Sequence, residues 1–81
     1  NMTEQTTFQP KPRSFPTITL EMQPGGCIST IERPKTVRQL LDRLGYLEET
    51  ALVIRDGTLL TPDLAIQPND SIIVREVTSR G

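Results

Sequence analysis

The sequence contains no histidine, no tryptophan and only one cysteine, Cys27, among its 81 residues. A single cysteine forms no internal disulfide, which favours a reducing, cytoplasmic location. Without histidine and with one thiol, the chain offers neither the ligands of a zinc cluster nor the base of a histidine-dependent catalytic triad. We therefore expect no bound cofactor or metal and no enzymatic activity of its own, and Cys27 is expected to be a small, half-buried residue.

Aromatic residues and charge of one sign are also scarce. Phe8, Phe15 and Tyr46 are the only aromatic residues, and nine Lys and Arg are set against ten Asp and Glu, for a formal net charge of −1. Nucleic-acid binding usually depends on a basic stripe, often with stacking aromatics, so direct binding to DNA or RNA is not expected. No apolar run approaches the ~20 residues that cross a bilayer, so no membrane partner is expected either.

Acidic residues show no pattern of a catalytic pair. Asp63, Asp70 and Glu76 have neither helical nor strand spacing that would bring their carboxylates to one place. We expect all three to be solvated.

The length allows one domain, which divides into three segments. Residues 1–16 contain three prolines and few apolar side chains, so burial cannot offset the entropy of ordering them, and they are expected to form a flexible arm. Residues 17–77 are expected to fold, and residues 78–81 to form a flexible tail.

Alternating apolar residues predict strands, and glycine-rich turns separate them. From Thr17 to Met22 the alternation is strict, which places Ile18, Leu20 and Met22 on one face. Asp56-Gly57 is typical of a two-residue hairpin turn. The predicted strands span 17–22, 27–32, 51–55, 58–60 and 71–77.

One helix is predicted between the second and third strands. Thr36 is suited to cap it, and Gln39 is placed to complete a capping box. Gly45 can adopt the left-handed backbone conformation that ends a helix. Its apolar stripe, with the spacing i, i+3, i+4 and i+7, consists of Val37, Leu40, Leu41 and Leu44. A helix of two turns is unstable alone, so it must lie on the sheet, which makes the fold an α+β roll.

A turn at residues 63–66 precedes the last strand and is expected to send Leu64 or Ile66 into the core. In the last strand, Ile72 and Val74 are expected to face inward. Ile73 would then be exposed, beside Ile54 and with Arg75 on the same face, as a candidate partner surface. An alternative is that the N-terminal arm covers these residues.

Several strings resemble the β-grasp sulfur carriers of the ThiS and MoaD type. They are the helix start Thr36-Val37-Arg38-Gln39-Leu40-Leu41, the turn Asp56-Gly57, the strand entry 68–74, and the ending Val77-Thr78-Ser79-Arg80-Gly81. The resemblance covers residues 17–81. It implies a ubiquitin-like β-grasp fold, with a mixed four- to five-stranded sheet packed on one main helix. Arg80 stands where the family has the first glycine of a Gly-Gly ending.

The resemblance also implies a function for the tail. A carboxylate is a poor electrophile, so a partner adenylating enzyme would use ATP to activate Gly81, whose lack of a side chain leaves its carboxylate accessible. A sulfur donor would then convert it to a thiocarboxylate. Thr78, Ser79 and Arg80 would form the flexible segment that allows Gly81 to reach the partner's active site. The sulfur would pass to an acceptor enzyme of thiamine thiazole synthesis, tRNA thiolation or molybdopterin synthesis.

Three alternatives remain open at this stage. One is a ubiquitin-like protein-binding module whose tail has no carrier role, with Arg80 as the sign of that loss. Another is a protein modifier in which Gly81 forms an isopeptide bond to a lysine. The third is the small subunit of molybdopterin synthase, in which the tail enters a larger subunit.

Overall fold

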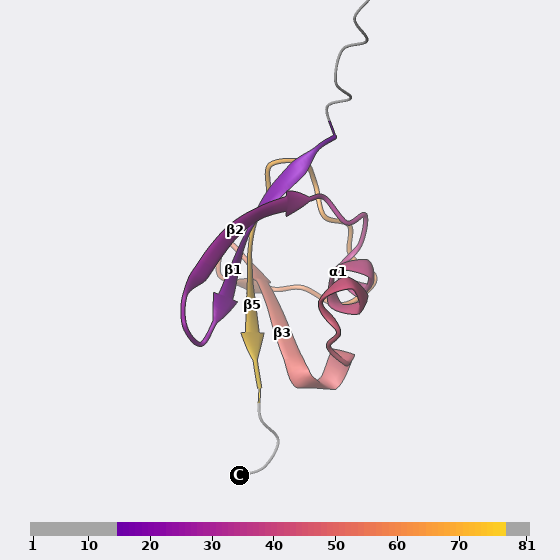
Figure 1. Cartoon of the computed structure of the whole chain (residues 1–81). Coiled ribbons are helices and arrows are strands. Elements are labelled where there is room, and N and C mark those ends of the chain that lie inside the picture. Colours follow the sequence, from indigo (N-terminus) through magenta and orange to yellow (C-terminus); the bar gives the residue numbers. More distant parts are fainter. Residues whose placement is uncertain (1–14, 78–81) are drawn as a thin grey trace, which may run out of the picture.

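A computed structural model of the protein describes the structure of residues 15–77. Its first two strands, β1 (Thr17–Gln23) and β2 (Cys27–Glu32), form an antiparallel hairpin (Figure 1). The alternation in β1 is confirmed, because Ile18 and Leu20 are buried while Thr17 and Thr19 are exposed. Met22 is half-buried and packs against the core.

The remaining strands complete one mixed sheet. They are β3 (Ala51–Arg55), β4 (Thr58–Leu59) and β5 (Ser71–Glu76), and the spatial order is β2-β1-β5-β3-β4. β5 pairs in parallel with β1 and antiparallel with β3, so the last strand lies in the middle of the sheet. The expectation of a mixed four- to five-stranded sheet is confirmed, with five strands in the described part of the chain.

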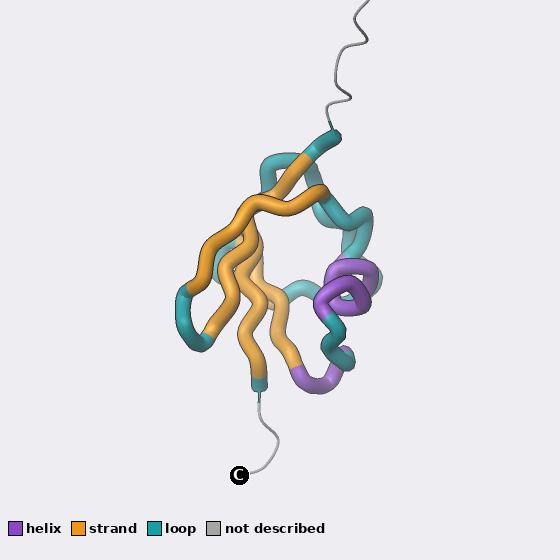
Figure 2. The backbone as a smooth tube through the Cα atoms, in the orientation of Figure 1, coloured by secondary structure: helices purple, strands orange, loops and turns teal. Residues whose placement is uncertain are grey.

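Helix α1 (Val37–Leu44) lies across one face of this sheet, and a short 3₁₀ helix, η2 (Glu48–Thr50), joins it to β3 (Figure 2). The Thr36 hydroxyl accepts from the backbone N–H of Gln39 at 3.2 Å, as predicted. The Gln39 side chain, however, accepts from the N–H of Lys35, one residue before the cap. Gly45 ends the helix at φ +82°, and its N–H donates to the carbonyl of Asp42. η2 was not predicted, because three residues are too few to show a period.

The core lies between α1 and the inner face of the sheet. Its buried residues come from every strand except β2 and β4, from α1 and from the segment between β4 and β5: Ile18, Leu20, Val37, Leu40, Leu41, Ala51, Val53, Leu60, Ile66, Ile72 and Val74. Of the two candidates between β4 and β5, Ile66 is fully buried and Leu64 is exposed. Ile72 and Val74 face inward as expected.

Three local expectations are wrong. Cys27 is exposed, not half-buried, because β2 is an edge strand in which no residue is fully buried. β4 ends at Leu59, and Leu60 leaves the strand to enter the core. Asp70 is not simply solvated, because its carboxylate accepts from the guanidinium of Arg55 at 2.7 Å and from the N–H of Gln67 at 2.8 Å.

Candidate functional site

The end of β5 is fixed by backbone contacts with its neighbours. β5 is held on both sides, by β1 and by β3. One residue beyond it, the N–H of Val77 donates to the carbonyl of Thr50 at 2.9 Å, which holds Val77 beside η2. The predicted carrier residue Gly81 and the predicted reach, Thr78, Ser79 and Arg80, lie outside the described residues, as do residues 1–14 of the predicted arm.

The predicted partner surface lies on the face of the sheet opposite α1. Ile54 of β3 is directly opposite Ile73 of β5, so the structure places these two side by side as expected. Both are half-buried, so the expectation that Ile73 is exposed holds only in part. Arg75 is exposed on the same face, and its Nε donates to the side chain of Gln23 at 3.0 Å. The three predicted residues therefore form one continuous surface.

The same face is apolar over a wider area than the sequence suggested. The strand register aligns one residue from each strand in a lateral row, which we call the outer row: Ile28, Glu21, Ile73, Ile54 and Leu59. Four of the five are apolar. Ile28 and Leu59, at its two ends, are 66% and 59% exposed. Leu52, opposite Arg75, adds a further partly exposed apolar side chain to this face.

One end of the outer row was predictable and the other was not. A two-residue turn at Asp56-Gly57 requires Leu59 to lie opposite Ile54, so the turn itself contained the signal. Ile28 joins the row only because β2 pairs with β1 and β1 pairs with β5. The β1–β5 pairing joins residues about 50 positions apart. No local sequence pattern in β1 or β5 predicts this pairing.

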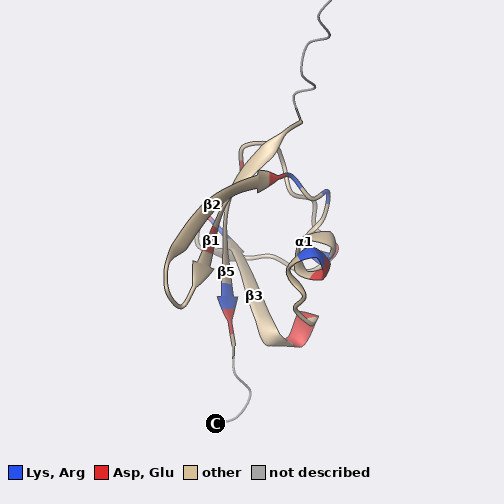
Figure 3. Cartoon of the chain, viewed as in Figure 1, with Lys and Arg blue, Asp and Glu red and all other residues tan. Residues whose placement is uncertain are grey.

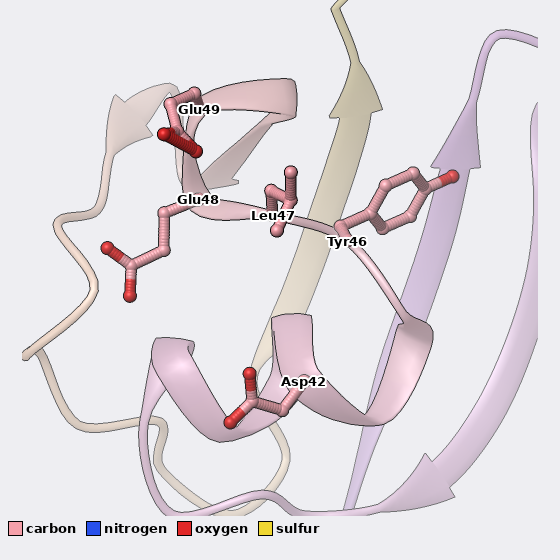
Figure 4. Close-up of a pocket in the computed structure, with 5 residues that line it drawn as sticks. All are labelled: Asp42, Tyr46, Leu47, Glu48 and Glu49. Carbon is pink, nitrogen blue, oxygen red and sulfur yellow. The ribbon is translucent and has the colours of Figure 1, made fainter.

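An acidic hollow lies between the C-terminal end of α1 and η2. Its volume is about 480 Å³, and it is lined by Asp42, Tyr46, Leu47, Glu48 and Glu49. Figure 4 shows the carboxylates of Asp42 and Glu48 on one side of the linking segment, with the Tyr46 ring pointing to the other. Glu48 forms an ion pair with Arg38 at 2.9 Å. The three carboxylates give this end of the domain a local negative charge, whereas elsewhere on the described ribbon the two signs are interspersed (Figure 3).

Between Phe15 and Val77, no three His, Cys, Asp or Glu side chains are grouped so as to hold a metal ion. No helix in this part of the chain has the length and hydropathy required to cross a membrane. One carboxyl group, Asp63, has a pKa below its ordinary value of 3.8, chiefly because the hydroxyl of Thr61 donates to it at 2.8 Å.

Comparison with known proteins defines the fold class. No protein-family model matches the sequence, and no curated protein matches it. Among solved structures, the chain is similar to an NMR structure of a computationally designed protein based on the template of human erythrocytic ubiquitin. The two are 27% identical, with a TM-score of 0.60, over 83% of this chain and 96% of the designed one.

The chain therefore has a ubiquitin-like β-grasp fold, as the sequence resemblance implied. The narrower likeness to ThiS and MoaD remains a resemblance between sequences.

Proposed function

We propose that this chain is a small sulfur carrier, located in the cytoplasm, whose Gly81 carboxylate is adenylated by a partner enzyme at the expense of ATP. Adenylation releases pyrophosphate, and a donor of sulfide-level sulfur then displaces AMP to give a Gly81 thiocarboxylate. From this group the sulfur passes to a biosynthetic acceptor of the thiazole, tRNA or molybdopterin class, and the Gly81 carboxylate is regenerated. The chain is the substrate of this chemistry and not its catalyst. The partner accommodates Arg80 in place of the usual glycine, which requires an acidic contact in that enzyme.

The observation that supports this proposal is the position of β5. A carrier tail must be held firmly at its base while its end enters another protein's active site. β5 is a central strand with ladder partners on both sides, and the contact from Val77 to Thr50 anchors the residue after it. Four residues, Thr78 to Gly81, then follow, a span of at most about 14 Å when extended.

The face around the outer row is suited to contact the adenylating enzyme. Ile54, Ile73 and Arg75 offer apolar area with one cation at its margin, and the fold places this face on the strand that leads to the tail. Exposed apolar patches of this kind mark protein interfaces.

ATP–pyrophosphate exchange tests the proposal. The adenylating enzyme encoded nearest to this chain in its host is assayed with the full chain, with a variant lacking Gly81 and with Cys27→Ser, an exposed position on β2, as the control. We expect exchange with the full chain and with Cys27→Ser, and none without Gly81. Exchange that is independent of Gly81 contradicts the carrier role.

A second candidate is a ubiquitin-like binding module without carrier activity, and the apolar outer row favours it. This module would keep its partner when Gly81 is removed and lose it when Ile73 is changed to Glu. A carrier would lose adenylation in both variants. Isopeptide-linked Gly81 on partner lysines, detected by peptide mass spectrometry, would identify a modifier instead.

A further inference from the structure

One edge of the sheet is incompletely paired. β3 pairs with β5 from Ala51 to Ile54, but β4 pairs with β3 only at Ile54 and Arg55. The N–H of Leu60 donates to the carbonyl of Val53 at 2.8 Å, and the chain then turns toward α1. Within residues 15–77, no strand lies beside Ala51–Val53 on the side away from β5.

The backbone of this segment is oriented to receive a strand. Alternate residues of a strand direct their N–H and C=O groups to the same side. Because the carbonyl of Val53 points toward β4, the N–H and C=O of Ala51 and the N–H of Val53 point toward that edge as well. The carbonyl of Thr50 points the other way, toward Val77. Such an edge is a template for strand addition.

An apolar groove follows this edge. Its volume is about 240 Å³, and it lies between α1 and the β3–β4 side of the sheet. Val37 and Leu41 line it from the helix, and Leu52 and Leu59, both partly exposed, line it from the outer face. The small side chain of Ala51 leaves room beside the helix. An added strand would direct alternate side chains toward Val37 and Leu41 on one face and toward Leu52 and Leu59 on the other.

The end of the groove beside Ala51 is acidic. Glu48 lines both this groove and the adjoining hollow, which also contains Asp42 and Glu49. Arg38 is paired with Glu48, and no ion pair among the described residues involves Asp42 or Glu49. A segment that enters the groove would gain from a cation at this end.

We propose that the groove binds an extended segment of a partner protein, which pairs antiparallel with β3 as a sixth strand. The segment has β-branched residues at alternate positions, for the groove, and Lys or Arg at its C-terminal end, beside Glu48 and Glu49. The groove shares Leu59 with the outer row but otherwise lies between β3 and α1, and the proposal does not depend on the chemistry of Gly81. Because Ala51 lies opposite Glu76, the bound segment would sit about two strand spacings, ~10 Å, from the end of β5.

Titration of the ¹⁵N-labelled full chain with the peptide acetyl-TVTVKR-amide tests this proposal. We expect saturable shifts of the amides of Ala51, Val53 and Leu60, with slower hydrogen exchange at Ala51 and Val53. The peptide acetyl-TPTPKR-amide, in which proline removes two backbone N–H groups and disfavours strand pairing, should cause none. The peptide acetyl-TVTVEE-amide places anions beside Glu48 and Glu49, so its affinity should be lower by at least about two-fold.

Matched variants of the protein separate the groove from the rest of the surface. Leu59→Ser, in the groove, should weaken binding several-fold, whereas Ile28→Ser, an equally exposed position on β2, should not. Glu49→Gln should weaken it about two- to five-fold, and Glu32→Gln, an exposed position on β2, should leave it unchanged. Shifts that spread along the outer row beyond Leu59, to Ile73 and Ile28, would overturn the proposal. Equal binding of the proline peptide, or no saturation at several millimolar peptide, would also overturn it. Self-association of the free chain through the same amides, seen by sedimentation, would also overturn it, because the occupant would then be a second copy.

Discussion

At the scale of single residues, Asp70 organises the turn that leads into β5. Its carboxylate accepts from Arg55 and from the N–H of Gln67, and its carbonyl accepts from the N–H of Thr19. Both side chains of the ion pair are mostly shielded, at 28% and 18% exposure, so solvent screens the pair less than it screens a surface pair. Sequence spacing gave no sign of this role, because Arg55 is fifteen residues away on another strand.

Replacing this carboxylate should therefore destabilise the domain. We expect Asp70→Ala to lower the free energy of unfolding by about 1–3 kcal/mol, because the Gln67 N–H and the Arg55 guanidinium both lose an acceptor. Urea unfolding followed by circular dichroism measures it. Glu48→Gln, which removes an exposed ion pair, is the matched control and should cost under about 1 kcal/mol. Equal losses of unfolding free energy in the two variants would contradict the role assigned to Asp70.

The carboxyl of Asp63 gives a pH-dependent prediction. The donated hydrogen bond from Thr61 favours the charged form and lowers the pKa below 3.8. Because the pKa is lower in the folded state, this contact stabilises the protein at neutral pH and is lost as the pH falls through the folded-state pKa. NMR titration should show Thr61→Val raising the Asp63 pKa toward 3.8. An unchanged pKa would contradict the assigned cause.

At the scale of elements, α1 is the part most fully determined by local sequence. Its cap, apolar stripe and glycine stop are all short-range signals, and each is found where it was predicted. Only the partner of the Gln39 side chain differs, by one residue. η2 and the exact end of β4 could not be predicted, because both depend on how the chain packs after it leaves the helix or the hairpin.

The cap should have a measurable effect on stability. Thr36→Ala leaves the Gln39 N–H without its side-chain acceptor, and we expect it to cost about 1 kcal/mol. Thermal unfolding provides the measurement. Thr36→Ser retains a hydroxyl and should recover most of the loss, whereas a serine variant as unstable as the alanine variant would contradict a capping role.

The segment between β4 and β5 contains a second test at this scale. Ile66 is fully buried, and its N–H donates to the carbonyl of Lys35, whereas Leu64 is 40% exposed. Ile66→Ala should destabilise the domain by about 2–5 kcal/mol, because it leaves a cavity in the core. Leu64→Ala should cost under about 1 kcal/mol. Denaturant midpoints that fall equally in the two variants would contradict the assignment of Ile66 to the core and of Leu64 to the surface.

At the scale of the whole molecule, the sheet order is what local sequence could not supply. The alternation in β1 and β5 shows which residues face the core, but not that the first and last strands are neighbours and parallel. The resemblance of residues 17–81 to β-grasp proteins implied a mixed sheet but did not assign this pairing. The pairing is also what unites Ile54, Ile73 and Arg75 with Ile28 and Leu59, so the candidate surface was only partly predictable.

The central proposal concerns the tail, and the mass of the intact protein from its native host tests it most directly. We predict a fraction whose mass corresponds to a chain that ends at Gly81 with one carboxylate oxygen replaced by sulfur. This fraction should disappear after alkylation of the thiocarboxylate, and the Cys27→Ser variant should still form it. A single species with an unmodified carboxylate, isolated from cells in which the adenylating enzyme is active, would contradict the carrier function, as would a chain that continues beyond Gly81.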